Sequence, residues 1–187
     1  MKNNIYVGLV HYPVYNKHFE IVTTSITNLD IHDIARSCIT FGVKGYYLIN
    51  RLSSQESLLS RVQDFWKTEI AQNYNSDRVE AFSVVRYARY IEDVLEDLKS
   101  QELTCPLLIS TTAVEMEGQK TFLETKEIIQ NSSRPVLLIF GTGNGLTEEI
   151  HRMSDIVLKP IKGYDNYNHL SVRSAVAIIL DRLISEI

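Results

Sequence analysis

The sequence has only two cysteines, Cys38 and Cys105, and only four prolines among its 187 residues. Both cysteines lie in apolar surroundings and are expected to be thiols, and no spacing of Cys and His resembles a metal site. No apolar run reaches the roughly 18 residues that a membrane span needs. The first 15 residues lack the apolar core and cleavage site of a secretory signal. We therefore expect no metal, no membrane segment and a cytoplasmic location.

Positive charge is not in excess either. The net charge is -4 and the pI about 5.7, which argues against a broad basic face that binds nucleic acid. Local basic patches remain at Lys17–His18 and at 86–89. The composition, 44% hydrophobic and 22% charged, is that of a globular protein, and the length suits a single domain over 1–187.

Short apolar runs alternate with segments of helical periodicity. Strands are predicted at 5–10, 45–49, 79–85, 106–109, 135–140 and 155–158, and helices from about 28 to 42, 58–70, 91–98, 120–130 and 172–187. Asn28 or Asp30 is expected to cap the first helix, and Trp66 to lie in the core. The alternation predicts an α/β fold with a mostly parallel six-stranded sheet flanked by helices. Residues 11–27 are open to two interpretations, a functional loop or a hairpin.

The fifth predicted strand runs into a glycine-rich loop, Gly141-Thr142-Gly143-Asn144-Gly145. Only 42 residues follow Gly145, too few for a dinucleotide-binding fold, whose glycine turn follows the first strand. No Gly-Lys-Ser/Thr follows, which excludes a P-loop. Glycines used simply for a tight turn are one alternative. However, polar segments also follow two other predicted strands, at 110–113 and 159–171, and ligands of parallel sheets bind at such carboxyl ends.

Four stretches carry a resemblance to a known class: TSITNLDIHDIARSCITFGVKGYYLI (24–49), LIFGTGNGL (138–146), DIVLKPIKG (155–163) and NYNHLSVRSAVAIILDRL (166–183). Together they resemble the SPOUT class of RNA methyltransferases. They are most similar to a small single-domain bacterial family of SAM-dependent RNA methyltransferases, which is sometimes fused to a tRNA guanine-N1 methyltransferase. The resemblance implies a deep C-terminal trefoil knot and a homodimer that methylates tRNA or rRNA.

The resemblance also implies a cofactor, S-adenosylmethionine, and a set of site residues. The glycines would let the backbone approach ribose and methionine, Thr111 would close the pocket, and three apolar side chains would hold the adenine. The candidate cofactor-binding residues are Thr111, Gly141, Gly143, Gly145, Leu158, Ile161, Gly163, Asn168, Leu170 and Ser171. The candidate catalytic residues are Arg36, as a phosphate ligand or to lower a hydroxyl pKa, Asp165 as a base and Asn168 as an orienting group or helix cap; His11 is a further candidate.

Two other functions fit the same residues. One is a non-catalytic module that binds SAM or a nucleotide as an accessory to another RNA-modifying enzyme. The other is a flavodoxin-like enzyme of small molecules whose glycine loop binds a phosphate.

Overall fold

The computed structural model describes residues 4–165 and 167–185. Its strands are β1 (Ile5–Val10), β2 (Val14–Tyr15), β3 (Ile21–Val22), β4 (Gly45–Ile49), β5 (Val85–Ala88), β6 (Leu107–Thr111), β7 (Val136–Gly141) and β8 (Ile156–Leu158). Its helices are α1 (Asn28–Thr40), α2 (Ser53–Trp66), α3 (Glu69–Tyr74), α4 (Ser76–Phe82), α5 (Ile91–Glu102), α6 (Phe122–Asn131), α7 (Glu148–Met153) and α8 (Val172–Ile184).

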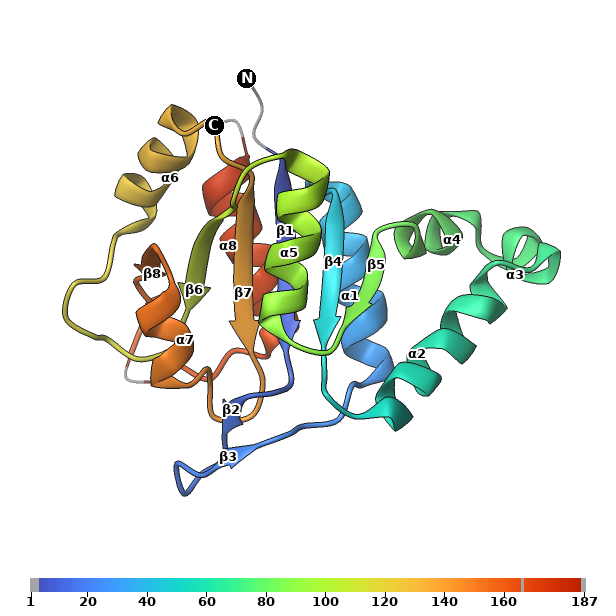
Figure 1. Ribbon diagram of the computed structural model, residues 1–187, viewed down its shortest axis with the longest axis horizontal. Helices are drawn as coiled ribbons and strands as arrows, with labels where there is room; N and C mark the ends of the chain where they lie inside the picture. The colour runs from blue at the N-terminus through green and yellow to red at the C-terminus, as the bar shows by residue number, and fades with distance from the viewer. Residues whose placement is uncertain (1–3, 166, 186–187) are drawn as a thin grey trace.

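Six strands form a parallel sheet in the order β5-β4-β1-β7-β6-β8 (Figure 1). Its centre is β1, which pairs with β4 on one side and β7 on the other. The predicted six-stranded sheet is therefore confirmed. Since every strand runs the same way, all six carboxyl ends lie along one edge, the lower edge in Figure 1. We call it the carboxyl edge.

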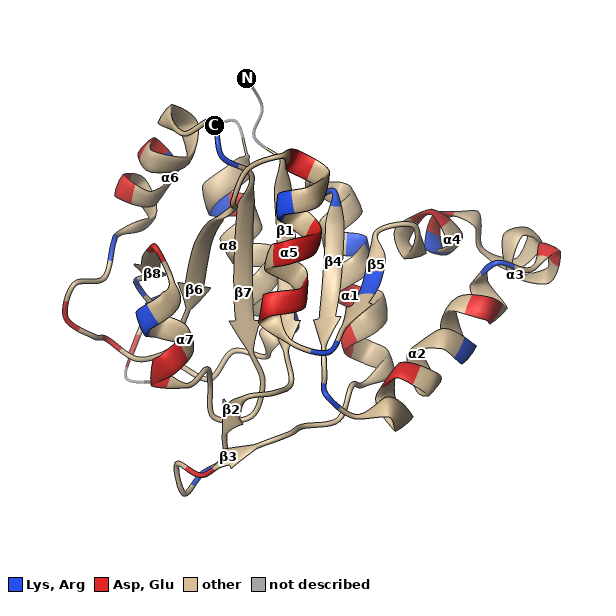
Figure 2. Cartoon of the chain, viewed as in Figure 1, with Lys and Arg blue, Asp and Glu red and all other residues tan. Residues whose placement is uncertain are grey.

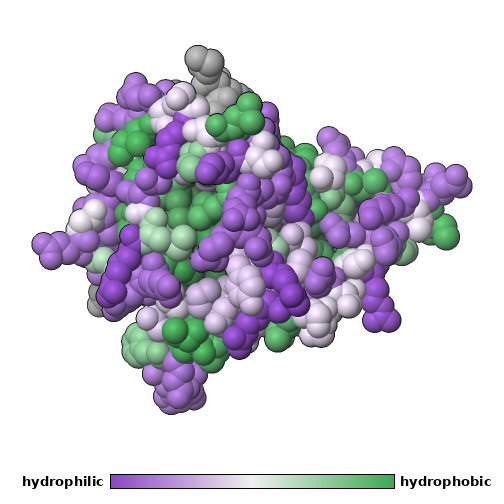
Figure 3. Space-filling view, viewed as in Figure 1, coloured by the Kyte–Doolittle hydropathy of each residue, from purple (hydrophilic) through white to green (hydrophobic). Residues whose placement is uncertain are grey.

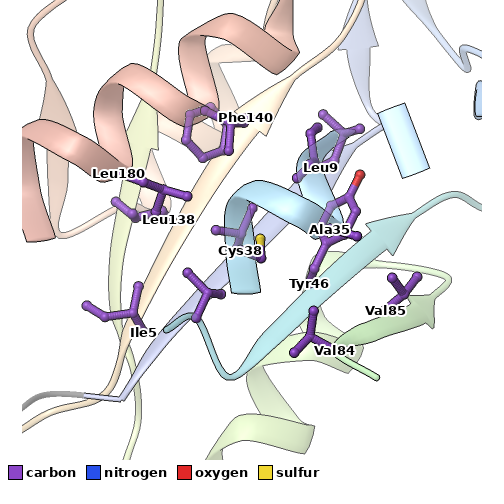
Figure 4. Close-up of a cluster of buried hydrophobic side chains, with 14 of the residues drawn as sticks. Ile5, Leu9, Ala35, Cys38, Tyr46, Val84, Val85, Leu138, Phe140 and Leu180 are labelled. Atoms are coloured by element: carbon purple, nitrogen blue, oxygen red, sulfur yellow. The ribbon is translucent and has the colours of Figure 1, made fainter. Parts of the chain in front are cut away.

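Both faces of the sheet are buried, which explains why its strands read as continuous apolar runs. Alternate residues face a layer that contains α1 and α8, and the others face α5 and α7. Figure 4 shows the first of these cores, where Phe140 of β7 and Leu180 of α8 lie near Cys38 of α1. Cys38 is buried as expected, whereas Cys105 is an exposed thiol, because it lies in the turn before β6 rather than in the strand.

The helices α1 and α8 pack side by side at the carboxyl edge. In the first turn of α8, Arg173 Nη1 contacts Asp30 Oδ1 of α1 at 2.8 Å. Asp30 is buried and also accepts a hydrogen bond from Thr27 Oγ1. A carboxylate removed from water needs such partners, so this pair fixes how the two helices meet.

The N-cap predicted for α1 from the sequence is wrong. The N-cap is Thr27, whose hydroxyl accepts from Asp30 N, rather than Asn28 or Asp30. Gly42 does follow the helix, with a φ of 67°, as a C-terminal glycine should. Residues 11–27 form the hairpin β2–β3 together with the extended segment that leads to α1.

Two further predictions need correction in the region between β4 and β5. The expected helix over 58–70 is two helices, because Thr68 caps a new one by accepting from Ala71 N. Trp66 is buried as expected, but Ile70 is 73% exposed. The expected strand 79–85 is mostly α4, which Asn75 caps by accepting from Arg78 N, and pairing with β4 begins only at Val85.

The C-terminal helix is confirmed over Val172–Ile184, while residues 186–187 of the predicted range lie outside the described residues. Within the part of the chain that the structure describes, no helix is long and apolar enough to cross a membrane.

Candidate functional site

Three segments from the second half of the chain meet at the carboxyl edge. They follow β6, β7 and β8, which are neighbours in the sheet (Figure 1). Thr111 at the end of β6 is buried and donates its hydroxyl to Ile139 O of β7 at 3.0 Å. Asn168 Nδ2 donates to Ala113 O at 2.7 Å, which fastens segment 159–171 to the loop after β6. The predicted convergence of these three segments is therefore present.

The glycine loop, residues 141–145, has a backbone that other residues cannot easily adopt. Gly143 has a φ of 60° and Gly145 a φ of 104°. A Cβ on Gly143 would lie 2.8 Å from Tyr15 O, and one on Gly141 would lie 2.7 Å from Leu146 N. Beside Gly145, by contrast, a Cβ would meet nothing within 4 Å. The loop is thus held tightly against protein on one side and open at Gly145, where another molecule has room to approach the backbone.

The hairpin holds the glycine loop in place, a role that the sequence did not reveal. Tyr15 N donates to Gly145 O at 2.9 Å, and Asn144 N donates to Tyr15 O at 2.8 Å. These bonds satisfy backbone groups of a loop that would otherwise need water or ligand partners. No periodic pattern in 11–27 signals the contact, since both partners are backbone atoms more than a hundred residues apart.

A chain of side-chain hydrogen bonds lies behind the loop. His11 Nδ1 is 2.9 Å from Thr24 Oγ1, which contacts Thr142 Oγ1, and Thr142 donates in turn to Val10 O at 3.0 Å. Asn50 Nδ2 donates to Thr24 O at 2.9 Å. The ends of β1, β4 and β7 are thereby joined through Thr24. His11, a candidate for catalysis on its sequence position, lies within this support and is fully buried.

Burial lowers the pKa of His11 to about 4, against a smaller opposing effect of Asp30. The unfolded chain takes up this proton below pH 6.5, whereas the folded chain takes it up only near pH 4. The contribution of the neutral imidazole to the free energy of unfolding is therefore fully present above pH 6.5. It is lost as the pH falls toward 4, and the total loss is about 3 kcal/mol.

We expect His11→Gln to reduce the pH dependence of the free energy of unfolding between pH 7 and pH 4.5. Urea titrations at several pH values measure it. The pKa values of His32 and His151 are also lowered, but these residues are present in both proteins, so their effects cancel in the comparison. Parallel wild-type and variant curves would contradict the assignment.

Segment 159–171 contains most of the other predicted cofactor residues. Leu158 is buried, Ile161 packs partly buried against the core, and Leu170 is 47% exposed. A Cβ on Gly163 would lie 2.8 Å from Tyr167 O, so the turn after Pro160 needs a glycine.

Segment 159–171 leads into α8, and Ser171 caps that helix by accepting from Ser174 N. Asn168 is therefore not the helix cap. Its amide joins two loops instead.

The candidate catalytic residues do not all lie near one another in the folded chain. Asp165 and Asn168 share segment 159–171, and Asp165 is exposed. Arg36 lies on the exposed side of α1, in a surface depression lined by Asn75, Asp77 and Arg78. Burial, and next the positive charge of Arg78, lower the pKa of the neighbouring His32, with a smaller contribution from Arg36. The lining of the depression thus carries two arginines and one aspartate, and it lies apart from the three loops.

No group of His, Cys, Asp and Glu in the described ranges has the arrangement of a metal site. Among the groups that the three loops after β6, β7 and β8 offer are backbone amides, hydroxyls, the Asn168 amide and the Asp165 carboxylate. Such groups can bind and orient an organic molecule.

Comparison with known proteins assigns the family. Residues 4–185 match a family model described as SAM-dependent RNA methyltransferase. An uncharacterized protein of Aquifex aeolicus is 36% identical over 99% of this chain and 90% of its own length. A tRNA (guanine-N(1)-)-methyltransferase of Oleidesulfovibrio alaskensis is 39% identical over 98% of this chain, which spans only 42% of that relative.

Solved structures share the fold. A probable methylase family protein from Haemophilus influenzae aligns with a TM-score of 0.66 at 17% identity, over 98% of this chain and 66% of that chain. The SpoU methyltransferase AviRb from Streptomyces viridochromogenes, in complex with the cofactor AdoMet, aligns with a TM-score of 0.57 at 16% identity. The alignment covers 98% of this chain and 58% of that chain. The motif resemblance is thereby confirmed, and this chain belongs to the family of SAM-dependent RNA methyltransferases.

Proposed function

We propose that this protein transfers the methyl group of S-adenosylmethionine to a nucleotide of tRNA or rRNA, acting as a single cytoplasmic domain. The observation that carries the proposal is the meeting of three loops at the carboxyl edge, two of which are joined by the bond between Asn168 and Ala113. Loops gathered at the carboxyl ends of parallel strands form the usual ligand site of such sheets. The family supplies the cofactor class, and the name of the Oleidesulfovibrio relative supports tRNA as the substrate.

The glycine loop has room for this cofactor at Gly145, because nothing in the protein lies within 4 Å of the position that a Cβ would take there. We assign the backbone of Gly141, Gly143 and Gly145 to its ribose and methionine, and Thr111 to the wall of the pocket. Segment 159–171, with Ile161, Gly163, Leu170 and Ser171, then encloses the adenine together with Leu158. Backbone amides suit this task because they can read the edge of a base without a charged side chain.

S-adenosylmethionine, when bound, supplies an electrophilic methyl carbon on a sulfonium. That carbon would be transferred to an acceptor atom of the nucleotide, with S-adenosylhomocysteine as the leaving group. The protein must align donor and acceptor and take up any proton that the acceptor loses. We assign the alignment to Asn168 and the proton to Asp165. Arg36 fits a phosphate contact better, because Arg78 lies beside it in the depression.

We further propose a homodimer and a knotted C-terminal segment. The outer surface of α1 exposes Leu29, and Leu170 is exposed just before α8, so apolar side chains face outward where the two helices meet. A second copy would cover them. The strand order supports the knot, because β7 inserts between β1 and β6 before the chain returns past β6 to β8.

A second function is favoured by one finding. This chain spans 42% of the Oleidesulfovibrio relative, so the matching region there is part of a longer protein, an arrangement that an accessory domain would have. A flavodoxin-like enzyme is not supported, since the family match and the shared fold both point to methyl transfer.

Labelled methyl transfer separates these possibilities. Purified protein is incubated with S-adenosylmethionine that carries a labelled methyl group and with total RNA from a strain that lacks the gene. We expect label in RNA that ribonuclease releases, and none with RNA from the parent strain, which is already modified. Binding of the cofactor without any incorporation of label would favour the accessory function. A folded protein that does not bind the cofactor would contradict both the methyltransferase and the accessory function.

A further inference from the structure

A cluster of two aromatic rings and one arginine lies at the carboxyl edge beyond the glycine loop. Its members follow three adjacent strands: Tyr12 follows β1, Arg51 follows β4 and Tyr90 follows β5. The Arg51 guanidinium carbon lies 4.0 Å from the centroid of the Tyr12 ring. The Tyr12 and Tyr90 rings are 6.4 Å apart in an edge-on arrangement. None of these residues belongs to the three loops assigned to the cofactor.

The arginine of this cluster is held in place by its contacts, but no carboxylate among the described residues forms an ion pair with it. Arg51 Nε donates to Thr23 Oγ1 at 2.9 Å, which fixes the plane of the guanidinium over Tyr12. Its two terminal nitrogens have no hydrogen-bond or ion-pair partner among the described residues, and the side chain is exposed. An arginine that is stacked on a ring and has both terminal NH2 groups free can make a bidentate contact to a phosphate, with two parallel hydrogen bonds.

The aromatic part is also accessible. Tyr90 is 44% exposed although its ring contacts that of Tyr12 in an edge-on arrangement, so part of the residue remains accessible to another molecule. Arg89, next to it, is exposed as well. Arginines interleaved with accessible aromatic rings are what proteins use to stack unpaired bases and hold the backbone that connects them.

The distribution of charge favours the same edge. Figure 2 shows acidic residues along the outer side of α5, which would repel a polyanion there. In the loops at the carboxyl edge, 11–27, 50–52, 89–90, 112–121, 142–147 and 159–171, basic residues outnumber acidic ones, although the whole chain carries a net charge of -4. Of the two acids in the first turn of α5, Glu92 and Asp93, Asp93 accepts a hydrogen bond from Tyr90 N at 2.9 Å.

We propose that the cluster of Tyr12, Arg51 and Tyr90 binds an unpaired nucleotide of the substrate RNA, with a base stacked on Tyr90 and its phosphate on Arg51. This rests on the proposed function, because it places the RNA at the half of the carboxyl edge that the cofactor loops do not use. A nucleotide held there sets which neighbouring nucleotide reaches the glycine loop. The cluster thereby selects for a single-stranded context around the methylated position.

The test is binding of a fluorescein-labelled, single-stranded 12-nucleotide RNA to the full chain, measured by anisotropy with and without a duplex competitor. Tyr90→Ala should weaken binding by about tenfold, within the range of one lost base stack, and Tyr90→Trp should restore it. Arg51→Gln should weaken binding and reduce the slope of log Kd against log salt by about one. Calorimetric affinity for S-adenosylmethionine should not change in any of these variants.

Matched controls come from the same chain. Tyr74, 75% exposed on α3, and Arg61, exposed on α2, present the same side chains away from the carboxyl edge. Tyr74→Ala and Arg61→Gln should leave RNA affinity unchanged. If the cluster variants behave like these controls while the wild type binds and methylates RNA, the cluster proposal is overturned and the proposed function stands. If the wild type neither binds the cofactor nor methylates RNA, the failure lies in the proposed function instead.

Discussion

Replacing Gly143 with valine should abolish binding of S-adenosylmethionine while the sheet stays folded. Gly143 has a φ of 60°, which a β-branched residue adopts only with strain, and its Cβ would lie 2.8 Å from Tyr15 O. The Tyr15 carbonyl is the acceptor that holds Asn144 N, so the substitution pushes the hairpin away from the glycine loop.

Such strain costs about 1–3 kcal/mol, less than the usual stability of a domain. The affinity should fall by about a hundredfold or more, since the backbone that binds the cofactor is displaced. Calorimetric titration measures the affinity, and far-ultraviolet circular dichroism checks the fold.

The control for this substitution is Gly42→Val. Gly42 follows α1 with a φ of 67°, close to that of Gly143, but a Cβ there meets nothing within 4 Å. It therefore carries the same backbone strain without the clash and lies outside the three loops. We expect the loss of stability that comes from the backbone strain alone, and an unchanged affinity. If both variants lose the cofactor equally, general destabilisation explains the effect and the glycine loop has no special part in binding.

Asn168→Asp should weaken cofactor binding by about tenfold or more. The substitution keeps the shape of the side chain but replaces the Nδ2 donor with a carboxylate oxygen that faces Ala113 O. Two acceptors then oppose each other where a 2.7 Å hydrogen bond had joined the loop after β6 to segment 159–171. The two walls of the proposed pocket separate, and the transfer rate falls with them.

Asn131→Asp provides the comparison, because Asn131 Nδ2 donates to Glu127 O at 2.9 Å on α6. The same kind of bond is lost there, away from the carboxyl edge. Cofactor affinity measured by calorimetry and turnover measured by methyl incorporation should be unaffected in this variant. Equal losses in both variants would show that the Asn168 bond does not shape the pocket.

The fold was largely predictable from the sequence, because the signals that define it are local. β1 and β4 read as buried apolar runs, and α8 has a strong helical period. The errors arise where a capping side chain overrides the apolar pattern. Thr68 begins a helix inside a longer apolar period, and Asn75 turns an apparent strand into α4. A cap depends on the conformation of one residue, which periodicity does not encode.

The site was predictable only in part. The three loops were found because each follows a buried strand, and parallel strands bring such ends together. The support of the glycine loop by Tyr15, and the buried chain from His11 to Thr142, were not found. These contacts join residues far apart in sequence, and the hairpin strands β2 and β3 that lie beside them have only two residues each. Figure 3 shows a hydrophobic patch near the lower edge of the molecule, with hydrophilic residues beneath it. The exposed hydrophobic side chains of the hairpin are Phe19, 78% exposed, and Ile21, 57% exposed.

The most direct test is a crystal structure of the protein with S-adenosylhomocysteine. We predict density for the ligand against the backbone at Gly141–Gly145, with Thr111 and segment 159–171 around it. The hairpin should keep the two hydrogen bonds between Tyr15 and the glycine loop. Ligand density elsewhere, for example in the depression lined by Arg36 and Arg78, with the three loops empty, would contradict the account.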